Sequence, residues 1–431
     1  MLENLLHSGH RALWQSLTAS LPTYAKTSGL VQRTSKLFKP EDFLLTLLAS
    51  VVSGKASYNQ LVISLSGQAA ACTVSPQALH QRVNRSECGL ESFLILCLVH
   101  ICQWQWSHRR LASKVPFSRI IIEDSSSLNF PKSNSHHFPA HGNASGQTAG
   151  CKINLAFDLL SGEILSNALH TATNQDKNIG WDLLDLISPN DLVVRDMGYF
   201  GCASFARIES LAAYWLSRLP LSVEATVEGG KSLIEILKKH RGARLDIAAK
   251  LTAKGHPVRL VAIRASDEER EARRRKIHAE ATANGRDASA RTLTLAAWHI
   301  LVTNIPASMQ GVEELVAIYS QRWQIEIVFR GWKDSLKMAC AFRRKSSPQH
   351  LKGLALAGMI VLAIGVKIGI SLARKEGQRY SLEKIQHSIG EKLTKITKLL
   401  DLSRFHPDPR HIKTQKRKRN SLASRLLELL R

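Results

Sequence analysis

A short segment near residue 320 carries four polar residues at a spacing that suits a chemical site. Tyr319, Arg322, Glu326 and Lys333 lie within the otherwise apolar residues 318–336. An α-helix turns by about 100° per residue, which brings these four positions into an arc of roughly 60°. The segment therefore predicts one helix with a narrow polar stripe. A glutamate on such a stripe is costly unless a partner meets it.

Two aspartates follow runs that are typical of buried strands. Asp124 comes after "RIIIE" and Asp196 after "LVVR". Ligands bind at the C-terminal ends of strands in an open α/β sheet. Together with Glu326, two strands and one helix would supply three carboxylates, whose hard oxygens suit Mg²⁺ or Mn²⁺ rather than zinc. Two such ions activate an attacking oxygen and stabilise a leaving oxygen at phosphorus.

Spacing alone leaves alternatives for these carboxylates. Acidic residues at strand ends are common caps and turn formers, and Asp158 in the hairpin motif "FDLLSG" needs no chemistry. Glu123 stands directly before Asp124, and the spacing does not exclude it as the carboxylate of the site in place of Asp124. Arg195, directly before Asp196, is expected to place a strong positive charge close to the site.

Other motifs do not indicate a zinc or nucleotide site. His136, His137 and His141 lie in a loop rich in Pro, Gly and Asn, with no helical pair and no nearby cysteine. The motif "VEGGKS" lacks the spacing of a phosphate-binding loop. We therefore expect no dependence on ATP.

The overall charge indicates a polyanionic partner. The 431 residues include 59 Lys and Arg against 35 Asp and Glu, a net charge of +24. Nucleic acid is the commonest partner for such a chain, and an anionic membrane or ribosome surface is the alternative. Seven cysteines form no C-x-x-C pair and the N-terminus lacks a secretion signal, so we expect a cytoplasmic protein. The apolar residues 354–366 fall short of the roughly 20 needed to span a bilayer and predict a buried helix instead.

Changes in composition and in hydrophobic periodicity along the chain predict five parts. Residues 1–115 are helical, 116–221 begin an α/β core with a mixed sheet, 222–296 form an inserted subdomain, 297–373 complete the core, and 374–431 form a basic helical tail. In "TVSPQALHQRVNR", Ser75 caps a short helix that is either a DNA-recognition helix or an ordinary surface helix. The basic run 413–419 is either an arm that grips phosphate or a solvated tail.

The same motifs carry a family resemblance. "YSQRWQIEIVFRGWK" has the pattern Y-x2-R-x3-E-x6-K and resembles the signature of bacterial DDE transposases of the insertion-sequence-four family. "IIIEDSSSL" and "VVRDMGYF" resemble the first and second aspartate blocks of that family, and "HHFPAHGNASGQTAGCKINLAFD" resembles the segment between them. The likeness extends from about residue 39 to about residue 373.

This resemblance implies a fold and a set of metal ligands. The fold would be α/β, an RNase H-like mixed sheet core with an N-terminal helical domain that binds DNA ends and an inserted, mainly β subdomain. Asp124, Asp196 and Glu326 would be the catalytic residues and would hold two Mg²⁺ (or Mn²⁺) ions. The partner would be double-stranded DNA, both the terminal inverted repeats of an element and its target.

The resemblance also implies residues that bind DNA. Tyr319, Arg322 and Lys333 would contact phosphate, and Trp298, 21 residues before the signature tyrosine, would stack on a base flipped out of the duplex. The alternative for Trp298 is a core position on a strand.

The function implied is cut-and-paste DNA transposition, with a dimer in the active complex. The alternatives are a catalytically decayed or regulatory relative that only binds DNA ends, and a nuclease that performs no strand transfer.

Overall fold

A computed structural model of the chain describes residues 2–32, 38–68, 74–85, 88–104, 115–143, 146–251, 255–330, 333, 341–342 and 346–376. The chain divides into two compact units. Unit 1 contains Met1–Val115, Asp124–Asn174 and Trp323–Arg431, and unit 2 contains Pro116–Glu123 and Gln175–Arg322. Residues 377–431, which hold nearly all of the basic tail including residues 413–419, lie outside the described residues.

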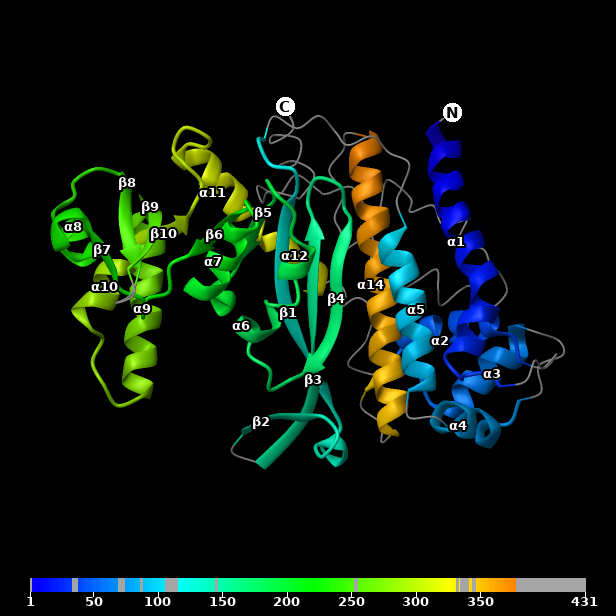
Figure 1. Cartoon of the computed structure of the whole chain (residues 1–431). Helices are drawn as coiled ribbons and strands as arrows, with labels where there is room; N and C mark the ends of the chain where they lie inside the picture. The colour runs from blue at the N-terminus through cyan, green and yellow to red at the C-terminus, as the bar shows by residue number, and fades with distance from the viewer. Residues whose placement is uncertain are drawn as a thin grey trace. The chain divides into compact units, whose positions relative to one another are not determined.

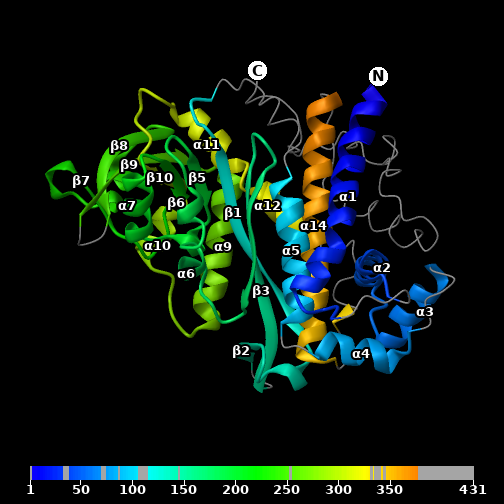
Figure 2. The same cartoon turned by 45° about the vertical axis from the view of Figure 1, so that its right-hand side comes forward.

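Unit 1 is built largely from helices, as predicted for the N-terminal residues. Its second helix begins at Pro40 and ends before Gly54, whose φ of 70° gives a left-handed cap, as is common for a glycine after the last helical residue. Helices α5 and α14 lie side by side in both views (Figures 1 and 2). The helices are α1 (Leu2–Thr27), α2 (Pro40–Ser53), α3 (Tyr58–Gln68), α4 (Pro76–Asn84), α5 (Gly89–Gln103), α12 (Trp323–Arg330) and α14 (Pro348–Glu376).

The apolar segment predicted as a buried helix is the centre of α14, which is longer than predicted. Its stretch Pro348–Ile368 is long and apolar enough to cross a membrane by length and composition, and 94% of it is buried inside the protein. Lys367, near the end of this stretch, donates a hydrogen bond from Nζ to the carbonyl oxygen of Trp104 at 2.9 Å. The helix is therefore the core of unit 1, and its buried amine has an acceptor.

The strands of unit 1 pair in the order β2-β3-β1, with β4 also paired to β3. Asp158 shows why the hairpin forms, because its buried carboxylate accepts from the backbone N–H groups of Leu160 and Ser161 at 3.0 and 2.8 Å. Its predicted role as a turn former is confirmed. The elements are β1 (Ile120–Phe130, of which unit 1 holds the part from Asp124), η1 (Lys132–Asn134), β2 (Pro139–Asn143), β3 (Gly146–Asp158) and β4 (Ile164–Thr171).

Unit 2 contains the strand order β1-β5-β6-β10-β9-β8-β7. The first three strands are parallel and the remaining pairs are antiparallel. The ring of Phe205 stacks on Trp215 with centroids 3.8 Å apart, which anchors α7 on the sheet. The strands are β5 (Leu192–Arg195), β6 (Tyr214–Arg218), β7 (Ala225–Val227), β8 (Arg244–Leu251), β9 (His256–Arg264) and β10 (Trp298–Thr303).

The helices of unit 2 connect these strands, and in the part of the chain described they are mostly short. They are α6 (Asp176–Ile179), η2 (Leu184–Leu186), η3 (Met197–Tyr199), α7 (Cys202–Ser210), η4 (Glu228–Gly230), α8 (Leu233–Lys239), α9 (Asp267–Ala283), α10 (Ala290–Leu295) and α11 (Val312–Ser320). A hairpin beside β1 in unit 1, and two strands parallel to β1 in unit 2, make the core an RNase H-like mixed α/β sheet, as predicted.

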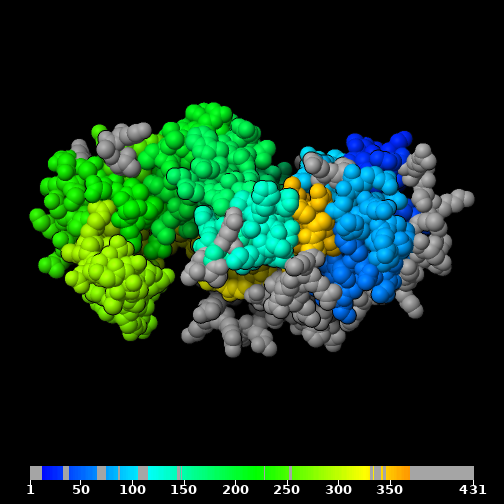
Figure 3. All heavy atoms as spheres, turned by 90° about the horizontal axis from the view of Figure 1, so that it is seen from below, coloured from blue at the N-terminus to red at the C-terminus, as the bar shows by residue number. Residues whose placement is uncertain are grey.

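The segment predicted as a mainly β insertion, residues 222–296, holds more helix than that description allows. It adds β7, β8 and β9 to the sheet and also carries α8, α9 and α10. Helix α9 begins with a capping box, in which Ser266 Oγ accepts from the Glu269 N–H and the Glu269 carboxylate accepts from the Ser266 N–H. Most side chains of α9 are exposed, and its yellow-green atoms lie on the surface of unit 2 (Figure 3).

Candidate active site

Asp196 lies where the sequence predicts it, at the C-terminal end of a buried parallel strand. All four residues of β5 are buried, and Asp196 follows as the N-cap of η3. Gly198 lies in the tight turn of η3 (Met197–Tyr199), and its backbone there is not left-handed. A Cβ atom at this position would lie 2.8 Å from a carboxylate oxygen of Asp176. A larger residue here would require the Asp176 carboxylate to shift, because α6 packs closely against the residues that follow Asp196.

The neighbouring pair Glu123 and Arg195 forms an ion pair inside unit 2. Strands β1 and β5 are in register at these two residues. Arg195 Nε donates to Glu123 Oε2 at 2.6 Å, and the side chains are 2% and 0% exposed. A second guanidinium nitrogen of Arg195 donates to the carbonyl oxygen of Gly180. The expectation that Arg195 adds a strong positive charge to the site is therefore wrong, because Glu123 neutralises it.

This ion pair bears on the choice between Glu123 and Asp124. Glu123 is committed to a buried cation, whereas Asp124 is half-buried and accepts a hydrogen bond from the backbone N–H of Ser125 at 2.8 Å. The prediction that β1 ends at Asp124 is wrong, since the strand continues to Phe130. Pairing with β5 does end there, at Glu123 and Arg195, and the rest of β1 pairs with β3. The geometry favours Asp124 over Glu123 as a ligand.

Three of the predicted side chains of unit 2 gather near the end of β5. Arg322 Nε lies 3.8 Å from Asp196 Oδ1, and the two side chains are 15% and 37% exposed. The Arg322 guanidinium also lies over the Tyr319 ring, 6.0 Å from its centroid. Burial raises the pKa of Tyr319 to about 12; the charge of Asp196 also raises it, while Arg322 and Arg218 lower it. The phenol is therefore a hydrogen-bond donor at neutral pH.

The prediction of a single helix over residues 318–336 is wrong, because the helix is interrupted and two separate helices form. Helix α11 ends at Ser320 and α12 begins at Trp323. Gln321 is fully buried, and its amide donates to the Ala317 carbonyl at 3.1 Å while its backbone N–H bonds to Ile318. The side chain takes the acceptor that a continuing α-helix would use, and the last turn tightens to i−3 hydrogen bonds. Tyr319 and Arg322 consequently belong to unit 2, and Glu326 to unit 1.

Glu326 and Lys333 lie beyond this break, in unit 1. Glu326 occupies the first turn of α12 and is half-buried. Lys333 is also half-buried, and its charge lowers the pKa of the Cys151 thiol on β3, against the larger raising effect of burial. Unit 1 therefore supplies a carboxylate and an ammonium group that are partly open to solvent.

Trp298 is the first residue of β10 and is 2% exposed. The Arg264 guanidinium covers its ring at 4.4 Å from the centroid, and His240 contacts it at a centroid separation of 5.9 Å. The ring is thus packed as a core residue of unit 2. Stacking on a base requires the Arg264 side chain to move first.

The capped helix α4 forms as predicted, with Ser75 accepting a hydrogen bond from the Ala78 N–H at 3.1 Å. Gln77, Gln81 and Arg85 are exposed at four-residue intervals and share one face of the helix. This face can approach a DNA groove, which keeps the recognition-helix interpretation open alongside that of an ordinary surface helix.

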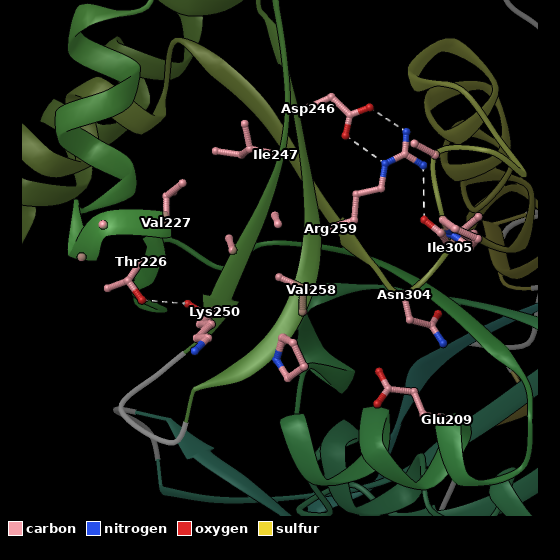
Figure 4. A pocket seen from close by; sticks show the side chains of 17 residues that line it. Glu209, Thr226, Val227, Asp246, Ile247, Lys250, Val258, Arg259, Asn304 and Ile305 are labelled. Carbon is pink, nitrogen blue, oxygen red and sulfur yellow. Dashed lines mark hydrogen bonds and ion pairs between the residues drawn. The ribbon is translucent and has the colours of Figure 1, made fainter.

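A separate hollow of about 1210 Å³ lies on unit 2, formed by β7, β8, β9 and the residues after β10 (Figure 4). Its polar side chains include Asp246 and Arg259, joined by two hydrogen bonds of 2.9 and 2.7 Å. None of the predicted site residues lines it among those described. The hollow is therefore not the candidate active site.

The three carboxylates suit a magnesium site by their chemistry, because each offers hard oxygen donors. Asp124 and Glu326 belong to unit 1 and Asp196 to unit 2. Within the described ranges, no group of three or more His, Cys, Asp or Glu side chains lies close enough together to hold a metal ion. That includes His136, His137 and His141. The metal ligands remain a prediction from the sequence.

Comparison with known proteins identifies the family. A family model for the transposase DDE domain matches residues 116–362. The chain belongs to this family. It is therefore a transposase, an enzyme that cleaves DNA in transposition, and the predicted resemblance to a bacterial DDE insertion-sequence transposase is confirmed.

Two transposases of Bacillus thuringiensis agree with this assignment. The transposase for insertion sequence element IS231E of Bacillus thuringiensis subsp. finitimus is 30% identical over 350 residues, covering 75% of this chain and 72% of that protein. The transposase for IS231C of Bacillus thuringiensis subsp. berliner is 29% identical over 347 residues, with the same coverage. A solved piggyBac transposase synaptic complex with hairpin DNA is similar over 89% of this chain and 78% of that chain, with 12% identity and a TM-score of 0.47.

Sequence reasoning misjudged one arginine near this site and missed another. Arg195 was read as a cation beside Asp196, and its partner lies 72 positions away in the chain. Arg218 was not considered, although it ends a strand as "YWLSR" just as Arg195 ends "LVVR". The pattern that marks such a residue is an arginine at the end of one strand and an aspartate at the end of the neighbouring strand.

Proposed function

We propose that this transposase cuts and joins DNA at the ends of an insertion sequence, with Asp124, Asp196 and Glu326 as the catalytic carboxylates. The observation that carries the proposal is the grouping of Asp196 with Arg322 and Tyr319 in a chain whose DDE domain spans residues 116–362. At one strand end, the carboxylate can help to hold a metal ion, and the guanidinium and the neutral phenol can donate hydrogen bonds to a phosphate, which together support phosphoryl transfer on DNA.

The carboxylates would hold two Mg²⁺ or Mn²⁺ ions. When bound, such ions lower the pKa of an attacking water or 3′-hydroxyl and neutralise charge on the leaving oxygen. The protein's own contribution is to orient the phosphate. Arg322 offers a planar fork that fits two phosphate oxygens, and Tyr319 donates one hydrogen bond. Lys333 adds a point charge from unit 1.

The DNA partner would be double-stranded, first the terminal repeats of the element and then the target. A net charge of +24 supports binding to such a polyanion. Two ends must be cut and joined together, so we propose a dimer as the active complex. Trp298 would stack on a flipped base after Arg264 has moved from its ring.

The experiment uses the full chain and a labelled duplex copied from the DNA that flanks its coding region. Incubation with Mg²⁺ should give nicked, excised and joined products on a denaturing gel, and EDTA should abolish all three. A scrambled duplex of equal length is the matched control. Binding to the flanking duplex without any cutting in Mg²⁺ or Mn²⁺ would instead identify a decayed or regulatory relative.

A further inference from the structure

Arg218 is the last residue of β6. It lies at the same end of the sheet as Asp196, which follows β5. Strands β5 and β6 run parallel with Arg195 opposite Ser217. Asp196 directly follows Arg195 in the chain, and Arg218 directly follows Ser217. On its other side β6 pairs with β10, with Arg218 opposite Leu301. The register therefore brings the backbone of Arg218 beside that of Asp196, and the charges of both residues act on Tyr319.

The guanidinium of Arg218 has no described partner. It is half-buried, and across the residues that the structure describes it forms no ion pair and no side-chain hydrogen bond. The other half-buried arginines of unit 2 are different. Arg259 is joined to Asp246 by two hydrogen bonds, and Arg273 donates to the carbonyl of Trp298 and the ring of His299. A half-buried guanidinium with no ion-pair partner among the described residues is available to bind an anion from outside the protein.

The groups around Arg218 are mostly positive or neutral donors. Its charge acts on Tyr319, His299 and Arg273, in each case against the protonated form. Two carboxylates lie in this group: Asp196, 3.8 Å from Arg322, and Glu269, which pairs with His299 at 3.1 Å. Like charges brought together by the fold are unfavourable until an anion lies between them.

We infer that Arg218 binds a backbone phosphate of the DNA, beside the phosphate that Arg322 and Tyr319 hold next to Asp196. The inference rests on the proposed function and extends it, because it assigns a DNA contact to a strand of the core sheet outside the Y-R-E-K signature. A guanidinium fork at this position matches two phosphate oxygens, which a lysine would contact as a point charge only.

The test measures DNA affinity at several salt concentrations by fluorescence anisotropy, with the flanking duplex and the scrambled duplex as probes. Arg218→Gln should weaken binding to both by on the order of tenfold, since one charge-assisted contact is lost. It should also lower the slope of log K against log salt by about one. Arg218→Lys should retain most of the slope and lose part of the affinity. Arg286→Ala removes the same charge from an exposed loop and should match wild type.

Wild-type affinity and slope for a folded Arg218→Gln protein would overturn the inference, as would an equal loss in Arg286→Ala. Thermal melting followed by circular dichroism establishes that each variant is folded, and Arg218→Lys serves as the second variant if Gln is not tolerated. Failure of the proposed function gives a different result. The wild type would then not distinguish the flanking duplex from the scrambled one, while the effect of Arg218→Gln on binding to either duplex is still measured.

Discussion

The ion pair between Glu123 and Arg195 gives Glu123 a structural role and leaves its neighbour Asp124 as the candidate catalytic carboxylate. Measurements of the free energy of unfolding can test this division of roles. Glu123→Leu leaves the guanidinium of Arg195 buried without its counter-charge. Removing one partner of a buried pair costs about 3–5 kcal/mol, against a total of about 5–15 kcal/mol for a typical domain. A loss of 4 kcal/mol lowers the ratio of folded to unfolded protein by roughly a thousandfold.

The double variant of Glu123 and Arg195 measures the coupling free energy between these two side chains. Glu123→Leu with Arg195→Met removes both charges, and apolar replacements of both partners of such a pair are often close to neutral. Here we expect incomplete recovery, because Arg195 also donates to the Gly180 carbonyl, and leaving that acceptor without a donor costs about 1–3 kcal/mol. The double variant should therefore be more stable than either single variant and less stable than wild type.

The assay is urea unfolding followed by tryptophan fluorescence, since Trp215 is 1% exposed and stacked in the core of unit 2. Asp124→Asn is the matched control and should change stability by less than about 1 kcal/mol while abolishing DNA nicking. Additive losses in the double variant would refute the coupling. A Glu123→Leu protein of wild-type stability that no longer nicks DNA would refute the assignment of Asp124 over Glu123.

Three further predictions concern the stripe residues, the tryptophan and a buried histidine. Arg322→Lys should impair complex assembly and cutting strongly, and Lys333→Arg only mildly, because the planar fork is lost in one and a point charge is kept in the other; a gel of labelled products over time checks this, and a fully active Arg322→Lys enzyme would contradict it. Trp298→Ala should lower the free energy of unfolding by about 3–5 kcal/mol, measured in urea, because its ring is buried; if the ring also stacks on a base, the folded variant still nicks the first strand and slows at the later step. Burial lowers the pKa of His350 to about 4, and neither ring nitrogen has a partner among the described residues, so the unfolded chain binds the proton first. The contribution of His350 is complete above about pH 6.5 and is lost as the pH falls toward 4, by roughly 3 kcal/mol at most; urea midpoints at several pH values should show a shallower acid limb for His350→Leu, and an unchanged limb would contradict the prediction.

The sequence predicted the elements well where the signal is local. The Ser75 cap, the left-handed end of α2 at Gly54 and the turn around Asp158 each depend on residues within one turn of each other, and the structure contains all three. The position of Asp196 directly after a buried strand was also predicted correctly, because a buried apolar run followed by an acid marks the end of β5.

The failures have non-local causes. Nothing in the spacing indicates that Glu123 pairs with Arg195, because the register of two parallel strands brings together residues 72 positions apart. The break at Gln321 depends on that side chain being fully buried, which no periodicity reveals. Strand β1 continues past Asp124 because β3 gives it a partner there, so the end of its pairing with β5 does not coincide with the end of the strand.

The central claim is that Asp124, Asp196 and Glu326 form one catalytic set. The direct measurement is nicking of the labelled flanking duplex in Mg²⁺ by Asp124→Ala, Asp196→Ala and Glu326→Ala, with DNA binding measured on the same preparations. Each variant should lose nicking and keep binding close to that of wild type, because metal ligation serves the chemistry more than the docking. Near-wild-type nicking by any one of the three folded variants would contradict the assignment of that residue.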